Sequence, residues 1–226
     1  MRVIFNEEMK SIADNLEHMA QDVHTAIYNA GYALANNDLE AAQKVIEGDA
    51  QTDELEATII DQCVKLLARQ NPVATDLRIV VSTMRLATTF KRMGDLSKHI
   101  AQSVRRTYPQ SPVPQDAQKL FANMVSFVQQ TADRMVHMLA DRDADIAKEI
   151  IEKDDVLDNL HKQVFDYVYS DEFNGTKQQL INVVLLGRFF ERIGDHAVSA
   201  ARRVLFIVSG FNPSLTPTRD EGTDID

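Results

Sequence analysis

Acidic side chains recur at a four-residue spacing in the second half of the chain. Asp154 and Asp158 form one pair, and Glu191 and Asp195 form another. Because residues four apart on a helix lie on the same face, each pair presents two carboxylates side by side. Both pairs interrupt stripes of apolar residues that recur every three or four positions, where a helix would bury its side chains. This placement makes the pairs candidates for ligand chemistry.

The two acidic pairs come together if the chain turns back near Asn174, because Asp158 then comes level with Glu191 across a helical hairpin. Unneutralised, such a cluster would destabilise the fold. A cation removes the repulsion, and oxygen-rich ligands suit iron, manganese or magnesium better than zinc. The alternative is a half-exposed groove in which the acids are solvated. We predict a metal site from these residues: Asp154, Asp158, Glu191, Asp195 and His161.

The first half of the chain carries a weaker version of the same pattern. Asp49, Asp53 and Asp95 occupy the equivalent positions, but Lys91 stands where the second half has Glu191. An ammonium group at that place could neutralise the acids without a metal. We therefore predict an asymmetric protein, in which this first cluster is a weaker or metal-free site. His99, four residues after Asp95, is a further candidate for it.

These equivalences rest on an internal duplication. Residues 34–49 align with residues 139–154 at seven identical positions out of sixteen, and residues 86–95 match residues 186–195. The matches keep their order and nearly their spacing, which is the signature of a repeated unit. The two halves are therefore expected to share one fold.

The prolines and the apolar period indicate helices. A stripe from Phe5 to Ala30 alternates steps of four and three residues, which predicts one long helix. Asp38 is a suitable N-cap for a second helix, and Asn71 with Pro72 for a third. In the second half, a continuous helix is expected to carry residues 147–168. Short turns between long helices predict an all-α protein of two tandem antiparallel three-helix bundles.

The chain divides accordingly into four segments. The first bundle is expected at residues 1–107, a proline-rich linker at 108–114, the second bundle at 115–211, and a disordered acidic tail at 212–226.

Composition excludes several classes of protein. The 226 residues include 34 acidic and 24 basic side chains, a net charge of −10, which argues against a nucleic-acid binder. No uncharged apolar run is long enough to span a membrane. A single cysteine, Cys63, cannot form an internal disulfide and favours a reducing, intracellular setting. Glycine-rich phosphate loops and Gly-x-Ser-x-Gly are absent, so we expect no organic cofactor.

Four stretches of the sequence resemble the PhoU family of phosphate-transport accessory proteins. They are Glu-Arg-Ile-Gly-Asp-His at 191–196, its degenerate copy at 91–95, the turn Gln-Asn-Pro-Val-Ala-Thr-Asp-Leu-Arg at 70–78, and the duplicated Asp-x-x-x-Asp. The resemblance covers about residues 2–210. It implies two similar three-helix bundles whose acidic motifs bind iron or other metals in some members. Lys91 departs from the glutamate usual in the family.

The resemblance also implies a regulatory role and not a catalytic one, so we do not expect an enzyme. It leads us to expect a cytoplasmic negative regulator of phosphate uptake and of the phosphate-starvation response, at the inner face of membrane complexes. Its partners would be the ATPase subunit of the high-affinity phosphate ABC transporter and a sensor histidine kinase, and it would form a homodimer.

An enzyme is the alternative interpretation. Asp158-x-x-His161 with Glu191 and Asp195 is similar to the ligand sets of di-iron carboxylate bundles, which carry out oxygen chemistry. Only one such carboxylate–histidine pair occurs, because the other half has Glu56 where His161 would be repeated. A di-metal oxidase or a metal-storage bundle therefore stays open at this point.

Overall fold

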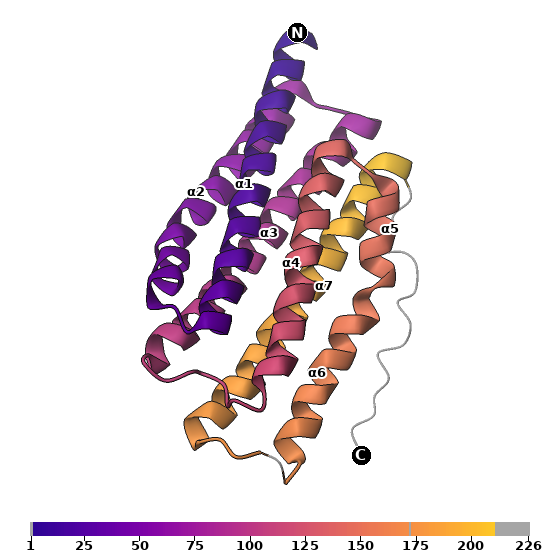
Figure 1. The fold of residues 1–226 in the computed structure, drawn as a ribbon. Coiled ribbons are helices and arrows are strands. Elements are labelled where there is room, and N and C mark those ends of the chain that lie inside the picture. The colour runs from indigo at the N-terminus through magenta and orange to yellow at the C-terminus, as the bar shows by residue number, and fades with distance from the viewer. Residues whose placement is uncertain (1, 172, 211–226) are drawn as a thin grey trace.

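The computed structural model describes residues 2–171 and 173–210, and these form seven helices and no strand. The first bundle contains α1 (Arg2–Asn36), α2 (Leu39–Gln70) and α3 (Ala74–Thr107). The second contains α4 (Gln118–Asp141), α5 (Ala144–Glu152), α6 (Asp154–Tyr169) and α7 (Lys177–Ser209), as Figure 1 shows. The predicted all-α fold of two tandem three-helix bundles is confirmed, with α5 and α6 together filling the place of one helix. The tail predicted at 212–226 lies outside the described residues.

Local capping explains several helix ends. The side chain of Asp38 accepts a hydrogen bond from the backbone N–H of Ala41 and begins α2, as predicted. Thr176 and Gln179 form a reciprocal capping box at the start of α7. Gly210 ends α7 with a φ of 75°, a left-handed conformation that glycine adopts without steric cost.

The start of α3 differs from the prediction. Asn71 adopts a left-handed conformation and its N–H binds the carbonyl of Leu67, so it ends α2 and does not begin α3. Asparagine tolerates this conformation, and Pro72 has no N–H with which to extend α2. The chain then passes through Val73 before α3 begins at Ala74.

The helix predicted over residues 147–168 is broken at Lys153. The acidic side chains Glu152, Asp154 and Asp155 follow one another closely there. Restarting the helix at Asp154 places two of these carboxylates in a first turn, where the helix dipole favours negative charge. The break therefore relieves part of the repulsion that a continuous helix would impose.

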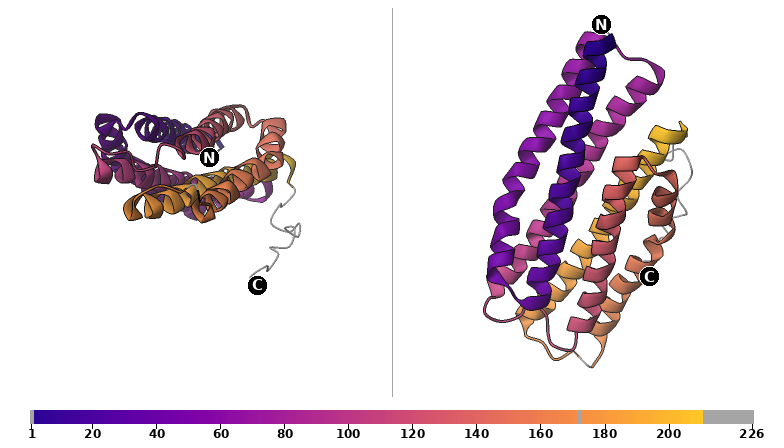
Figure 2. Two further views of the ribbon diagram at one scale, coloured as in Figure 1. Left: turned by 60° about the horizontal axis from the view of Figure 1, so that its bottom comes forward. Right: turned by 45° about the horizontal axis from the view of Figure 1, so that its top comes forward.

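The two bundles pack side by side and share one hydrophobic core. In the end-on view of Figure 2, α1 and α4 lie next to each other in one layer, and α3 and α7 in the other. Between α1 and α4, Tyr28 donates a hydrogen bond of 2.7 Å to Asp133, and His24 Nε2 lies 2.8 Å from the same carboxylate. Across the contact between the bundles, α1 runs antiparallel to α4 and α3 runs antiparallel to α7, because the second bundle is turned over relative to the first.

The proline-rich linker is held by side-chain amides at one end of both bundles. Asn37 donates to the carbonyl of Pro109 at 2.6 Å, and Asn182 donates to that of Pro112 at 3.3 Å. The buried amide of Asn182 thereby fastens the linker to α7. These bonds fix how the second bundle begins relative to the first.

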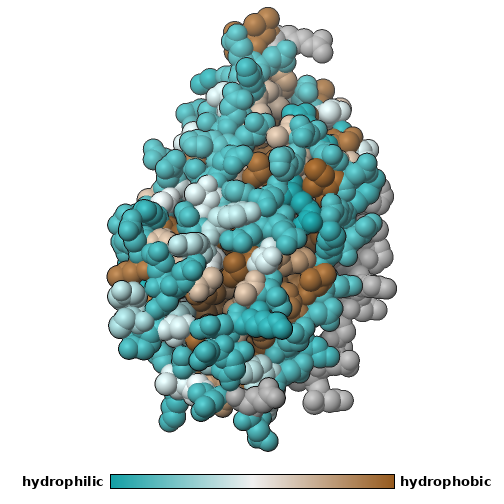
Figure 3. Space-filling view, in the orientation of Figure 1, coloured by the Kyte–Doolittle hydropathy of each residue, from teal (hydrophilic) through white to brown (hydrophobic). Residues whose placement is uncertain are grey.

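The surface is largely hydrophilic on the face shown in Figure 3, with apolar side chains scattered between polar ones. None of the described helices combines the length and the hydropathy that crossing a bilayer requires.

Candidate metal centres

The second acidic cluster forms where α6 packs closely on α7. Gly194 lies against Leu157, and a Cβ built on this glycine would come 2.7 Å from Leu157 Cδ2. Seven residues earlier, about two helical turns away, Gly187 faces Val164 and His161 in the same manner. The hairpin therefore brings the acidic residues of α6 opposite those of α7, as the sequence predicts.

The four carboxylates of this cluster act on one another. Burial, followed by the charges of Asp158 and Asp195, raises the pKa of Asp154 to about 6. Burial and the charge of Asp195 likewise raise the pKa of Glu191 to about 7. The pKa values of Asp158 and Asp195 are also raised, with burial as the main cause. Each carboxylate is therefore costly to ionise.

The cluster lies at the surface and is in part exposed to solvent. Asp158 and Asp195 are exposed, and Asp154, Glu191 and His161 are half-buried. The sequence placed these carboxylates on the buried stripes of their helices, and in that respect the prediction was wrong. Open access to solvent leaves room for water to complete the shell of a bound cation.

Two atoms of the cluster are buried without a hydrogen-bond partner. Arg188 binds one oxygen of Glu191, but the other oxygen, Oε2, has no partner. His161 Nε2 is likewise buried without a hydrogen-bond partner. Burial lowers the pKa of this imidazole. A neutral imidazole nitrogen and free carboxylate oxygens are ligands that iron and manganese accept, so the donor types fit a divalent cation. No three of these ligand atoms lie within 4.8 Å of one another, so the side chains would have to draw together around the ion.

The first acidic cluster is more compact. Asp49, Asp53 and Asp95 each bring one carboxylate oxygen within 4.8 Å of the other two, and within the described residues this is the one such group. Asp49 is buried, Asp95 is half-buried and Asp53 is exposed. The tighter arrangement lies in the half where the sequence predicts the weaker site.

Two lysines neutralise this first cluster. Lys91 Nζ lies 2.7 Å from Asp95 Oδ1 and 3.3 Å from Asp53 Oδ1, so it bridges the two carboxylates as the sequence predicts. Its hydrogen bond to Asp95 raises the pKa of Lys91 and keeps the ammonium charged. Lys98 Nζ lies 2.5 Å from Asp49 Oδ2. The three acids are therefore paired with two ammonium groups, which occupy the space that a cation would need.

Sequence reasoning missed Lys98 and misplaced His99. Lys98 lies seven residues after Lys91, two helical turns along the same face of α3, and this spacing could have revealed it. His99 points away from the first cluster and stacks on Phe189 of α7, with 5.3 Å between ring centroids. It therefore does not extend the first cluster.

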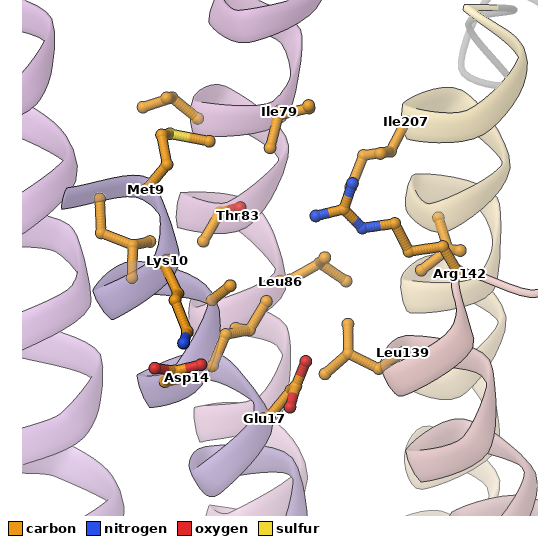
Figure 4. A pocket seen from close by; sticks show the side chains of 15 residues that line it. Met9, Lys10, Asp14, Glu17, Ile79, Thr83, Leu86, Leu139, Arg142 and Ile207 are labelled. Atoms are coloured by element: carbon orange, nitrogen blue, oxygen red, sulfur yellow. The ribbon is translucent and has the colours of Figure 1, made fainter. Parts of the chain in front are cut away.

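A cavity of about 380 Å³ lies between the two bundles, near the start of α1 and away from both acidic clusters. Figure 4 shows its apolar side chains, among them Leu86, Leu139 and Ile207, with Arg142 reaching into the space from the end of α4. Charged groups of α1, including Lys10, lie at its edge. Two carboxylates, Asp14 and Glu17, also line it, together with the basic Lys10 and Arg142. Among the described residues they are not part of a group of three metal-ligating side chains.

The fold and the two clusters define a class: a duplicated helical bundle with acidic side chains at matched places in its halves. A family model described as the PhoU domain matches residues 16–104 and again residues 121–204. The chain belongs to the PhoU family.

Relatives and solved structures agree over nearly the whole length. The chain is 33% identical over 221 residues to "Phosphate-specific transport system accessory protein PhoU homolog 1" of Mycobacterium tuberculosis, which covers 98% of each chain. It is also 33% identical to homolog 2 of the same organism, over 94% of this chain and 100% of the relative.

The crystal structure of PhoU from Pseudomonas aeruginosa superposes with a TM-score of 0.82 at 28% identity, covering 92% of this chain and 100% of that one. The phosphate transport system regulatory protein PhoU of Streptococcus pneumoniae, at 21% identity and a TM-score of 0.79, shares the fold.

Proposed function

We propose that this protein is an accessory regulator of phosphate transport that represses phosphate uptake and the phosphate-starvation response when phosphate is plentiful. The observation that carries the proposal is similarity along nearly the full chain to proteins named as accessory to the phosphate-specific transport system. Matched repeats in both halves support it, because the whole duplicated architecture is retained and not one domain alone.

The proposed mode of action is that of an adaptor. The protein would act in the cytoplasm at the inner face of membrane complexes, between the ATPase subunit of a phosphate ABC transporter and a sensor histidine kinase. Long helical faces around one shared core offer several surfaces for partners. The proposal includes a homodimer as the working form.

The second acidic cluster is proposed as a metal site that stiffens the α6–α7 hairpin. Asp154, Asp158, Glu191 and Asp195 would supply oxygen ligands and His161 a nitrogen, for iron, manganese, magnesium or zinc. The raised pKa values of Glu191 and Asp154, together with the unpartnered buried atoms, support this assignment. A divalent cation would remove the repulsion and satisfy those atoms at the same time. The first cluster is proposed to work without metal, since Lys91 and Lys98 already balance its acids.

A non-enzymatic role is proposed over the oxidase and storage alternatives. Bundles that hold two metals for oxygen chemistry repeat a carboxylate–histidine motif on two helices. Here the pairing of Asp158 with His161 is not repeated in the first half, where the corresponding acids are bound to lysines. Oxygen uptake on adding ferrous iron to the purified protein would contradict this proposal; no uptake above the buffer rate is expected.

The regulatory proposal is tested by deleting the gene and measuring a phosphate-starvation reporter in phosphate-rich medium. We expect the reporter to switch on in the deletion strain and to be silenced by the wild-type gene on a plasmid. Asp158→Ala tests the metal site, and Asp166→Ala, an exposed carboxylate two turns further along α6, is the matched control. A reporter that stays off in the deletion strain would contradict the regulatory role.

A further inference from the structure

The outer seam between α3 and α7 has a register fixed by contacts at two places. Towards one end, His99 stacks on Phe189. At the other end, Arg78 Nη2 donates a hydrogen bond of 3.2 Å to the carbonyl of Ile207. Because the helices run antiparallel with a rise of about 1.5 Å per residue, positions between these contacts come level in order. Arg92 of α3 thereby comes level with His196 of α7, and Arg85 with Arg203.

Four arginines line this seam, and we refer to them as the arginine row: Arg85, Arg92, Arg192 and Arg203. The first three are exposed, and Arg203 is half-buried with its guanidinium carbon 5.9 Å from the centre of the Phe206 ring. Arg92 forms an ion pair with Asp95 at 3.6 Å. Among the described residues, the other three members of the row have no carboxylate close enough for an ion pair.

Positive charges in the row face one another. Burial, and then the charge of Arg85, lowers the pKa of Arg203. This shift has the sign expected when two guanidinium groups face each other.

The row is unusual in a chain whose net charge is −10, since acids are abundant enough to pair every base. Three exposed lysines elsewhere follow that rule, whereas others, Lys119 and Lys162 among them, form no ion pair within the described residues. Lys44, Lys65 and Lys148 each pair with a carboxylate three or four residues away at 2.6–2.8 Å. What distinguishes the row is that its unpaired cations stand next to one another. Like charges held together lower the free energy of unfolding. Asp95 and the nearby Asp195 offset the charges of Arg92 and Arg192 only in part, so the arginine row is better explained by an anion that it receives from outside.

We propose that the arginine row is a docking surface for an acidic segment of a partner protein. Arginine presents a planar fork that binds a carboxylate through two parallel hydrogen bonds, which suits glutamate and aspartate side chains. Val81 is 37% exposed beside Arg85, one turn away on α3, and Phe206 is half-buried at the same end of the seam. Apolar neighbours of this kind are covered by a polypeptide and not by a small anion.

The surroundings of the row favour a narrow partner over a membrane or a nucleic acid. Asp95 with its cluster lies on the α2 side of the seam, and Asp195 with its cluster lies on the α6 side. A planar anionic bilayer or a nucleic acid would meet these acids together with the protein's overall negative charge. A single acidic segment can lie between the two clusters and touch only the row. The inference does not depend on the regulatory role, because it concerns binding by the purified protein.

The test uses a fluorescein-labelled oligoglutamate peptide, titrated with purified full-length protein and followed by fluorescence anisotropy. Replacing the four arginines of the row by glutamine is expected to weaken binding at least about tenfold, or 1.4 kcal/mol. The matched control replaces four exposed lysines outside the row by glutamine, which removes the same charge: Lys44, Lys65, Lys119 and Lys148. This control is expected to bind within about twofold of wild type, a difference well below 1 kcal/mol.

Circular dichroism checks that each variant folds. If loss of the half-buried Arg203 prevents folding, the triple variant Arg85→Gln, Arg92→Gln, Arg192→Gln replaces it, since all three side chains are exposed. Equal weakening by the row variant and the lysine control would overturn the proposal, because binding would then follow net charge alone. No binding of oligoglutamate by wild type would overturn it as well.

Two further measurements decide the nature of the occupant. Vesicles of phosphatidylglycerol are expected not to bind; retention of wild type, but not of the row variant, on such vesicles would replace the protein partner by a membrane. A chain shortened after Gly210 is expected to bind oligoglutamate with unchanged affinity. A rise of about tenfold on shortening, equivalent to 1.4 kcal/mol, would instead show that residues 211–226 compete for the row.

Discussion

The two acidic clusters descend from one duplicated unit but solve the same electrostatic problem differently. In the first, Lys91 and Lys98 bind the three carboxylates directly, and the group draws together within 4.8 Å. In the second, the equivalent positions are Glu191 and Val198, so that both cations are missing and one further acid is present. The carboxylates there stay farther apart, have raised pKa values and are in part exposed to solvent.

This difference shows that a short distance between carboxylates does not by itself indicate a metal site. Acids come close together when a side-chain cation already holds them, and they stay apart when the cation is missing. Charge balance therefore points to the second cluster as the metal site, although its geometry is looser. Each prediction below changes one side of this comparison, beginning with the largest expected effect.

The metal content of the purified protein is expected to differ most between a variant of the second cluster and a variant of the first. Asp158→Ala is expected to abolish retention of manganese or ferrous iron by the purified protein, because it removes one proposed ligand from a cluster whose acids no lysine neutralises. Asp53→Ala is expected to leave the metal content unchanged. Elemental analysis after dialysis measures both variants. Equal loss of metal from the two would contradict the asymmetry, and loss from Asp53→Ala alone would reverse it.

The free energy of unfolding should respond most to changes in the first acidic cluster, in the other half of the chain. Lys98→Met leaves the buried carboxylate of Asp49 without its partner, and we expect the free energy of unfolding to fall by about 3 kcal/mol, at the low end for a broken buried pair because Lys98 is partly exposed. Urea denaturation measures it. The double variant Asp49→Asn, Lys98→Met is the control and should recover most of the loss. A single variant as stable as wild type would show that Lys98 does not neutralise the cluster.

The pH dependence of stability distinguishes the clusters without added metal. The pKa of Glu191 is about 7 in the folded protein against an ordinary value of 4.5. The folded state therefore holds its proton more tightly, and stability is lost as the pH rises from about 4.5 through 7.

Glu191→Gln removes this group, so in the presence of a chelator it should stabilise the protein by about 1–2 kcal/mol at pH 8, a figure reduced for solvent screening, with no gain at pH 4. Asp53→Asn, which loses its ion pair with Lys91, should gain nothing at either pH. Urea denaturation at the two pH values measures both variants. A gain for Glu191→Gln that is equal at pH 4 and pH 8 would show that the effect is not due to the charge.

Much of the architecture could be predicted from the sequence, because it depends on periodicity and duplication. The three-four stripe of α1, the Asp38 cap and the matched halves all depend on local pattern, and the structure contains them. The break at Lys153 and the left-handed Asn71 were missed. They depend on repulsion between acids and on how a proline follows a helix end, which apolar periodicity does not report.

The site was predicted less completely, for a similar reason. Periodicity identifies the face of a helix on which Asp49 or Asp158 lies, but not which lysine reaches across to it. Lys98 pairs with Asp49 only because α2 and α3 pack at one particular height. The exposure of Asp158 and Asp195 likewise follows from the tilt of α6 against α7, which the sequence pattern leaves open.

The smallest expected effect concerns Gly94 and Gly194, which the sequence presents as equivalent. A Cβ on Gly94 would meet Thr52 at 3.4 Å, an ordinary contact, whereas one on Gly194 would come 2.7 Å from the buried Leu157. Gly94→Ala should therefore stabilise the protein by up to about 1 kcal/mol through helix propensity. Gly194→Ala must displace Leu157, and overpacking of about 1–3 kcal/mol cancels or exceeds that gain. Thermal or urea unfolding of the two variants measures the difference. Equal stabilisation by both would mean that α6 sits as loosely on α7 as α2 sits on α3, and the close hairpin proposed to hold the metal ligands would lose its support.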